Sequence, residues 1–204
     1  MKYNKYRIPV LFSCVLGLFM LGVGVVDYLS TPTTDNPEDE PVIRTSVKTG
    51  SKQTDLTQET MVAPVQEGVD IVRYFYEVDG ENNHQALDYF EGVYRQSKGI
   101  DYGSSEAFDV VAALSGTVTE VKKDAILGVC VTIECENGIE LIYQSLANVG
   151  LEEGQSIAQG NLIGESGHNI YEADLGNHVH FTVEKDGVAV NPLKLLNKNI
   201  NEIN

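Results

Sequence analysis

The most informative segment of the chain reads Gly176-Asn177-His178-Val179-His180-Phe181. Side chains alternate between the two faces of a β-strand, so the two histidines project on one face while Val179 and Phe181 point into a core on the other. Two neighbouring imidazoles can bind zinc, but a catalytic zinc normally has three protein ligands and one open position. A third ligand would therefore have to come from another part of the chain.

The sequence around this segment has mostly the periodicity of β-strands. Short β-branched and aromatic runs alternate with turn residues, which predicts a mainly β domain built on an antiparallel sheet. The turn sequences Glu136-Asn137-Gly138 and Lys185-Asp186-Gly187 each predict a hairpin. Helix is predicted only in two short stretches, residues 85–94 and 192–197. Strands are expected at residues 69–76, 108–113, 117–121, 128–135, 139–143, 179–184 and 188–190.

The N-terminal segment has the properties of a membrane anchor. Residues 8–28 are predicted to form a transmembrane helix, because the side chains before Asp27 are almost all apolar and about 20 such residues span a bilayer. Two lysines and an arginine precede the segment, so residues 1–7 are expected in the cytoplasm and the rest of the chain outside. A cleaved signal peptide is the alternative, but no small-residue cleavage pattern follows Val26.

The remaining length of this 204-residue chain suits one domain with flexible ends. Residues 29–62 are rich in Thr, Ser, Asp, Glu and Pro, a composition that cannot bury enough apolar surface to offset chain entropy, so they predict a flexible linker. The globular domain is placed at residues 63–197, and a short tail at residues 198–204.

Charge and cysteine usage exclude some functions. The chain has 30 acidic and 14 basic residues and a net charge of −16, which argues against binding to nucleic acid. Cys14 lies in the predicted anchor. Cys130 and Cys135 fall on one predicted strand, on opposite faces and about 16 Å apart, so they are expected to be unbridged core residues.

Three elements occur along the chain in a recognisable order. They read Ser97-Lys98-Gly99-Ile100-Asp101, Tyr143-Gln144-Ser145-Leu146 and His178-Val179-His180. This order resembles the LytM, or M23 peptidase, domain, which has a His-x-Gly-x-Asp element, a Tyr-x-His-Leu element and a terminal His-x-His. The resemblance implies the antiparallel β-sheet of the duplicated-hybrid-motif fold.

The resemblance also implies a role for each matching position. Asp101 and His180 match zinc ligands, and Ser97 stands where the family has the third ligand. His178 matches a residue that handles the attacking water, and Ser145 stands where its histidine partner should be. A serine hydroxyl is a weak zinc ligand and no base near neutral pH. We therefore expect a pseudoenzyme, with vestigial positions only, no catalytic residues and zinc absent or weakly bound.

The other histidines are weak candidates to replace the missing zinc ligand. His168 is the best alternative ligand, but it lies in a predicted turn and matches no ligand position of the family. His84 lies in a polar loop and is expected to be solvated. Two further hypotheses stay open, a zinc-dependent endopeptidase that cleaves peptidoglycan and a module that binds peptidoglycan without cleaving it.

The arrangement of segments along the whole chain makes the resemblance more specific. A single anchor, an acidic linker and a LytM domain with Tyr-Gln-Ser-Leu and Gly-Asn-His-Val-His-Phe elements resemble the stage II sporulation protein Q family. That resemblance implies a protein anchored in the forespore membrane, with its domain in the intermembrane space. There it would bind stage III sporulation protein AH of the mother cell, supporting engulfment and an intercellular channel. The sequence leaves the interface residues and assembly into a hetero-oligomeric ring undecided.

Overall fold

The computed structural model describes residues 58–203. The predicted cytoplasmic N-terminus, the predicted anchor at residues 8–28, Cys14 and most of the predicted linker lie outside these residues. Within residues 58–203, no helix is both long and apolar enough to cross a membrane.

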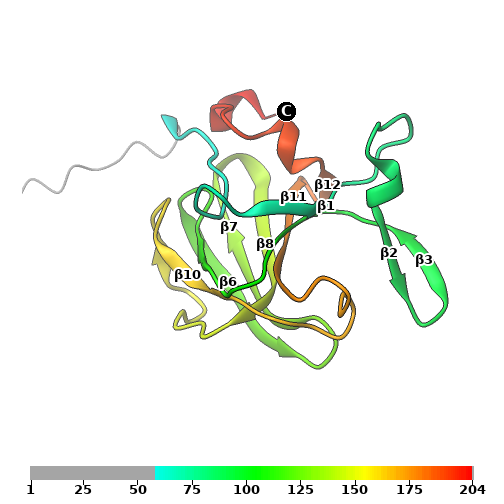
Figure 1. The fold of residues 1–204 in the computed structure, drawn as a ribbon. Coiled ribbons are helices and arrows are strands. Elements are labelled where there is room, and N and C mark those ends of the chain that lie inside the picture. Colours follow the sequence, from blue (N-terminus) through cyan, green and yellow to red (C-terminus); the bar gives the residue numbers. More distant parts are fainter. Residues whose placement is uncertain (1–57, 204) are drawn as a thin grey trace, which may run out of the picture. The chain divides into compact units, whose positions relative to one another are not determined.

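The described residues form a large antiparallel sheet and a separate two-stranded sheet (Figure 1). The path through the large sheet runs β1-β4-β11-β8-β7-β6-β9, with β12 paired to β11, β10 paired to β8, and β5 paired to β10. Its strands are β1 Asp70–Arg73, β4 Ile100–Ser104, β5 Asp109–Val111, β6 Gly116–Asp124, β7 Gly128–Glu134, β8 Ile139–Ala147, β9 Ser156–Ile157, β10 Leu162–Ser166, β11 Asn177–Lys185 and β12 Val188–Val190. The mainly antiparallel β-fold predicted from the sequence is therefore confirmed.

Strand β11 carries the His-Val-His segment through the middle of this sheet. It pairs with β4 on one side and with β8 on the other. Val179 and Phe181 are fully buried, as predicted, and the Phe181 ring lies 5.1 Å from that of Tyr143. His178 is also fully buried and His180 is 7% exposed, so the strand is covered on both faces rather than half-exposed.

The hydrophobic core gathers side chains from most strands of the large sheet. The hydroxyl of the buried Tyr143 accepts a hydrogen bond from the backbone N–H of Ala113 at 3.0 Å, so this polar group is satisfied inside the core. Met61, Ile200 and Ile203 also belong to the core, although the sequence places the domain at residues 63–197. The short 3-10 helices are Asn83–Gln85, Glu136–Gly138, Pro192–Lys194 and Ile200–Glu202.

Both predicted hairpins are confirmed. Strands β7 and β8 pair across a turn in which Asn137 has a φ of 59°, and β11 pairs with β12 across Asp186 and Gly187, with φ of 51° and 77°. Asparagine, aspartate and glycine tolerate this left-handed conformation better than other residues. Cys130 and Cys135 are both buried free thiols on this part of the sheet.

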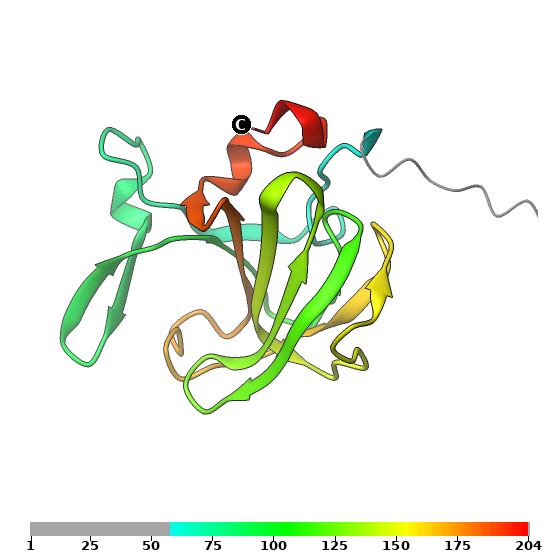
Figure 2. The same cartoon turned by 180° about the vertical axis from the view of Figure 1, so that it is seen from behind.

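The helix predicted at residues 85–94 is wrong. These residues form strands β2 (Leu87–Phe90) and β3 (Val93–Gln96), a hairpin that stands away from the large sheet in Figures 1 and 2. Its turn places Glu91 and Gly92 at φ of 50° and 80°, which a helix cannot accommodate. The rings of Tyr89 and Tyr94 face each other across the hairpin, with centroids 4.8 Å apart. Cross-strand pairing therefore overrides the helical periodicity of this stretch.

Two smaller differences concern the ends of elements. The helix predicted at residues 192–197 is only the single 3-10 turn Pro192–Lys194. Asp101 follows Gly99 and Ile100, where the sequence predicts a turn, but it lies within strand β4 and is fully buried. Pairing with β11 explains the difference, because the ladder begins at Ile100, directly after the glycine.

Candidate functional site

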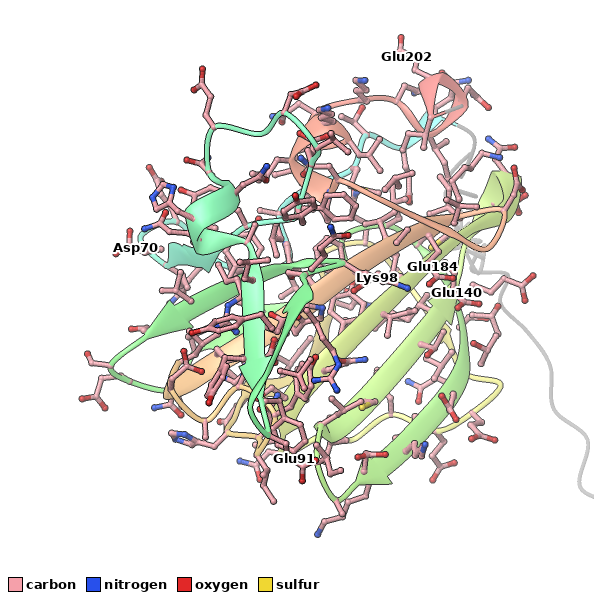
Figure 3. The ribbon with its side chains drawn as sticks, turned by 90° about the vertical axis from the view of Figure 1, so that its right-hand side faces the viewer. Asp70, Glu91, Lys98, Glu140, Glu184 and Glu202 are labelled. Atoms are coloured by element: carbon pink, nitrogen blue, oxygen red, sulfur yellow. The ribbon has the colours of Figure 1, made fainter. Side chains whose placement is uncertain are left out.

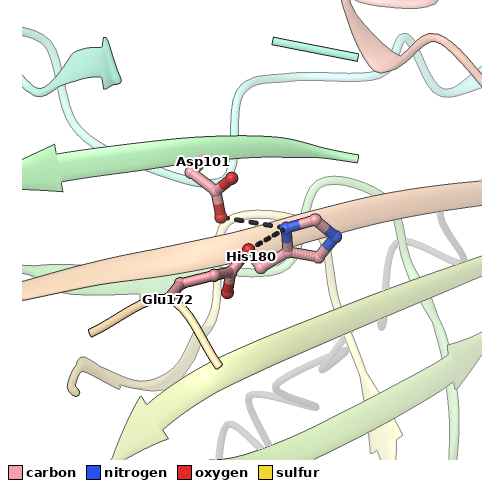
Figure 4. Close-up of side chains that lie close together, drawn as sticks. All are labelled: Asp101, Glu172 and His180. Atoms are coloured by element: carbon pink, nitrogen blue, oxygen red, sulfur yellow. Dashed lines mark hydrogen bonds and ion pairs between the residues drawn. The ribbon is translucent and has the colours of Figure 1, made fainter. Parts of the chain in front are cut away.

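The register between β4 and β11 brings two of the predicted site residues together. Asp101 and His180 are directly opposite each other on the two strands. The Nδ1 atom of His180 lies 2.9 Å from Oδ1 of Asp101. Figure 4 marks this contact with a dashed line. The pair that matches two zinc-ligand positions is therefore held by backbone pairing of the sheet.

A buried glutamate, absent from the predicted site, joins this pair. Glu172 is 2% exposed, and its Oε1 atom lies 3.3 Å from Nδ1 of His180 (Figure 4). Its Oε2 atom lies 3.2 Å from Nε2 of His178. One carboxylate thus connects the two histidines of β11.

The loop between β10 and β11 is built to point Glu172 inward. The backbone N–H of Glu172 donates to Oδ1 of Asn169 at 2.6 Å, and the Asn169 amide donates back to Oε2 of Glu172 at 2.9 Å. Asn169 is itself 9% exposed. This reciprocal pair fixes the loop and the carboxylate together.

Arg73, at the end of β1, approaches the same carboxylate from the edge of the sheet. Its guanidinium nitrogens lie 3.6 Å from Oε1 of Glu172, 3.4 Å from Oδ1 of Asp88 and 2.9 Å from Oδ2 of Asp174. The Arg73 and Asp88 side chains are 8% and 7% exposed. A guanidinium keeps its charge in proteins, so it is a permanent cation inside this cluster.

Burial and charge act in opposite directions on the two histidines. Burial alone would lower the pKa of His180, but Asp101 and Glu172 raise that pKa well above its ordinary value of 6.5. Burial would also lower the pKa of His178. Hydrogen bonds to Glu172 and to the carbonyl of Gly176 outweigh burial, so the pKa of His178 is raised. Nδ1 of His178 lies 2.9 Å from the carbonyl oxygen of Gly176, and Nε2 lies 3.2 Å from both Oε2 of Glu172 and the amide nitrogen of Asn169.

The pKa values of the carboxyl groups in the cluster shift in different directions. Burial would raise the pKa of Glu172, yet hydrogen bonds from His178 and His180 hold it below the ordinary 4.5. Burial raises the pKa of Asp88 to about 6, and the charge of Glu172 adds to that shift. Burial also raises the pKa of Asp101, against the influence of His180. Because imidazole is more basic than a carboxyl group, the proton of the Asp101–His180 pair belongs on His180.

Ser97 is buried in the turn that precedes β4. Its hydroxyl donates to the carbonyl of Gly99 at 3.2 Å and lies 3.5 Å from the N–H of the same residue. A Cβ added to Gly99 would lie 2.6 Å from Nε2 of His180, so the turn packs directly against that ring. Ser97 therefore stabilises the local backbone, and within residues 58–203 its hydroxyl forms no hydrogen bond with Asp101 or His180.

Ser145 lies on β8 in a left-handed conformation, with a φ of 64°. It is fully buried, and its hydroxyl has no hydrogen-bond partner within residues 58–203. A hydroxyl in this state cannot take a proton from water near neutral pH. The structure therefore gives Ser145 no chemical partner in the cluster.

A groove of about 660 Å³ lies above the cluster. The β2–β3 hairpin and the turn after it contribute Tyr94, Arg95 and Lys98, while Tyr171 and Gln144 line other walls. Glu172 and His180 lie at its inner end. The groove combines aromatic, amide and basic groups with the acidic side chains of Asp88 and Glu172.

The strands next to the site also present an acidic surface. Glu140 on β8 and Glu184 on β11 are directly opposite each other, and Figure 3 shows their side chains close together. Burial, together with the charge of Glu184, raises the pKa of Glu140. Such a surface repels polyanions, in agreement with the acidic composition.

Comparison with known proteins places this geometry in a family. The M23 peptidase family model matches residues 95–192. The chain is 43% identical over 153 residues to stage II sporulation protein Q of Bacillus subtilis, which covers 72% of this chain and 54% of the relative. A chain in the solved SpoIIQ–SpoIIIAH pore forming complex matches with a TM-score of 0.70 and 43% identity, covering 72% of this chain and 96% of that chain. The chain belongs to the SpoIIQ branch of the M23 peptidase family.

More distant M23 structures share the fold. A zinc containing peptidase from Vibrio cholerae matches with a TM-score of 0.56 and 20% identity, covering 66% of this chain and 39% of that chain. At that identity the likeness concerns the fold alone. This chain spans about half the length of the B. subtilis protein, at 54%.

The M23 fold raises the question of whether the residues present fit a zinc ion. Asp101, Glu172 and His180 offer ligand atoms within 4.8 Å of one another, and Oδ2 of Asp101 has no hydrogen-bond partner among the described residues. Carboxylate oxygens and an imidazole nitrogen are donor types that zinc takes. One observation opposes an ion there, because the permanent cation of Arg73 lies 3.6 Å from Oε1 of Glu172 and would repel a divalent ion. The neighbouring guanidinium, rather than the donor types, makes these residues a poor fit for zinc.

The structure separates the predicted site residues into two groups. Asp101, His178 and His180 meet in the cluster, while Ser97 and Ser145 lie outside its hydrogen bonds. His168 and His84 are exposed, and neither is in the cluster. Sequence reasoning missed Glu172 and Arg73, because a single glutamate in a loop and a single arginine on a strand carry no spacing signal.

Proposed function

We propose that this chain is a sporulation protein whose M23-type domain binds a SpoIIIAH-like protein of the mother cell across the intermembrane space. In this proposal an anchor at residues 8–28 holds it in the forespore membrane, and the complex supports engulfment and an intercellular channel. The observation that carries the proposal is the 43% identity to SpoIIQ, together with the match to a chain of the SpoIIQ–SpoIIIAH complex. A tethered module in each membrane raises the effective concentration of its partner, so modest contacts can hold two membranes together.

A binding experiment tests this role. The full chain in detergent micelles is mixed with the ectodomain of SpoIIIAH from the same organism and run on a size-exclusion column, with and without EDTA. We expect both proteins in one earlier peak under both conditions. Separate elution in both conditions would contradict the proposal, and a complex seen only with added zinc would contradict its independence from metal.

We further propose that the domain does not hydrolyse peptide bonds. Serine at positions 97 and 145, and the closed ionic cluster around Glu172, support this reading. Incubation with cross-linked muropeptides, beside an active M23 enzyme as positive control, should leave the substrate intact. Cleavage that is lost in a His180→Ala variant would instead establish the alternative, a zinc-dependent endopeptidase.

The groove favours a second candidate function, binding of peptidoglycan without cleavage. Its lining of aromatic, amide, basic and acidic side chains suits a wall peptide that carries polar and charged groups. Purified sacculi should then retain the full chain in EDTA, and a Tyr94→Ala/Lys98→Ala variant should be retained less. Equal retention of both proteins would count against the groove as the binding site.

A further inference from the structure

Glu172 enters the cluster at the place where a metal ion would have to bind. Its Oε1 atom lies 3.3 Å from Nδ1 of His180, and that same nitrogen lies 2.9 Å from Oδ1 of Asp101. An ion about 2.0–2.2 Å from both Asp101 and His180 would have to displace their hydrogen bond. An ion held by these two residues would also lie against the Glu172 carboxylate, whose Oε1 atom lies 3.6 Å from the guanidinium of Arg73.

Arg73 gives this glutamate a fixed counter-charge. Its guanidinium contacts Glu172 and Asp88 inside the protein and Asp174 at the surface. Because a guanidinium neither loses its proton nor accepts a hydrogen bond, it cannot act as a metal ligand. A divalent ion next to Glu172 would lie close to this cation and be repelled by it.

The permanent cation of Arg73 faces three carboxylates, those of Asp88, Glu172 and Asp174. Buried charges are tolerated when they are paired in this way. The guanidinium thus supplies positive charge at the side of the cluster where an ion next to Glu172 would otherwise bring it.

We propose that the Arg73–Glu172 ion pair takes the place of the metal ion in this chain, so that it opposes zinc binding independently of the serine at position 97. The pair holds the loop between β10 and β11 against β11 and β1, as an ion would hold its ligands. The inference rests on the proposed absence of zinc but not on the binding of a partner. Restoring the missing histidines alone should then not restore the metal site.

The test compares zinc binding by full-length variants in detergent micelles. A histidine-restored chain carries Ser97→His and Ser145→His, and a second chain carries these changes with Arg73→Met and Glu172→Ala. We expect the second chain to bind zinc on the order of 100-fold more tightly than the first in a competition assay with a chelating dye. The matched control adds Glu152→Gln, an exposed carboxylate, to the histidine-restored chain and should change nothing.

A further variant keeps the experiment decisive if removal of both side chains impairs folding. Glu172→Gln in the histidine-restored chain retains the shape and the hydrogen bond from Asn169, and circular dichroism reports its fold. It should bind zinc more tightly than the histidine-restored chain. Equal affinities with and without Glu172 would overturn the inference alone, whereas one zinc per unmodified chain would overturn both it and the proposed absence of hydrolysis.

Discussion

The two cross-strand positions of the site and its two serine positions differ in how well they match the M23 pattern. Asp101 and His180 are cross-strand partners inside the sheet, and they match the pattern. Ser97, in a turn, and Ser145, on β8 in a left-handed conformation, stand where the family has histidines. Directly paired strand residues are fixed by the ladder and the core, whereas a residue in a turn can change with little cost to the fold. The comparison teaches that strand pairing preserves the positions of two site residues while the side chains around them differ from the family pattern.

Truncation on strand β11 should have the largest effect. Phe181 is fully buried on β11 and packs against Tyr143, so Phe181→Ala leaves a cavity in the core. We expect a loss of about 4 kcal/mol in the free energy of unfolding, measured by urea denaturation of the full chain. A loss below about 1 kcal/mol would show that β11 does not anchor the site.

Breaking the Arg73–Glu172 ion pair should have the next largest effect. Glu172→Ala leaves the buried Arg73 without one of its partners and should cost about 3 kcal/mol. Replacing both residues by apolar ones, Arg73→Met/Glu172→Leu, should cost much less, because no unpaired charge remains. If the double variant is as unstable as the single one, the pair does not act as a unit.

The dependence of stability on pH should distinguish the contribution of His180 from that of Glu172. The pKa of His180 is raised above 6.5 in the folded state, so its contribution is fully present below that pH and is lost as pH rises through the folded pKa. Stability should therefore fall above pH 6.5, by about 1.4 kcal/mol per pH unit while one group titrates. Asp88, with its pKa at about 6, has largely finished titrating there.

Urea denaturation at a series of pH values measures this slope, and the His180→Gln variant is its control. The variant should show a flatter profile above pH 6.5, because the main titrating group is gone while His178 remains. The lowered pKa of Glu172 predicts a separate loss of stability as pH falls below 4.5. A profile in the unmodified chain that is level above pH 6.5 would contradict a protonated His180.

The smallest effect is expected at Ser145. Its hydroxyl is buried without a partner in the described part of the chain, so Ser145→Ala removes no hydrogen bond. The change in the free energy of unfolding should stay within about 0.5 kcal/mol. A loss above about 1 kcal/mol would show that this hydroxyl has a hydrogen-bond partner, and it would make Ser145 part of the cluster.

The residues that match the family motifs could be predicted from the sequence, whereas Glu172 and Arg73 could not. Alternation in the His-Val-His segment places both histidines opposite the core residues, and the order of the motifs adds Asp101. Glu172 and Arg73 meet through tertiary contacts between residues 99 positions apart, which no local pattern encodes. The β2–β3 hairpin was missed for a related reason, because its cross-strand pairs outweigh the local preference of the chain.

The most direct test of the account is the zinc content of the unmodified full chain. The protein is saturated with zinc, dialysed against metal-free buffer at neutral pH, and its metal is measured by mass spectrometry beside an active M23 enzyme. The account predicts far less than one zinc per chain here and about one in the active enzyme. One zinc per chain that is lost in the Glu172→Gln variant would show instead that Glu172 is a metal ligand, and it would contradict the account.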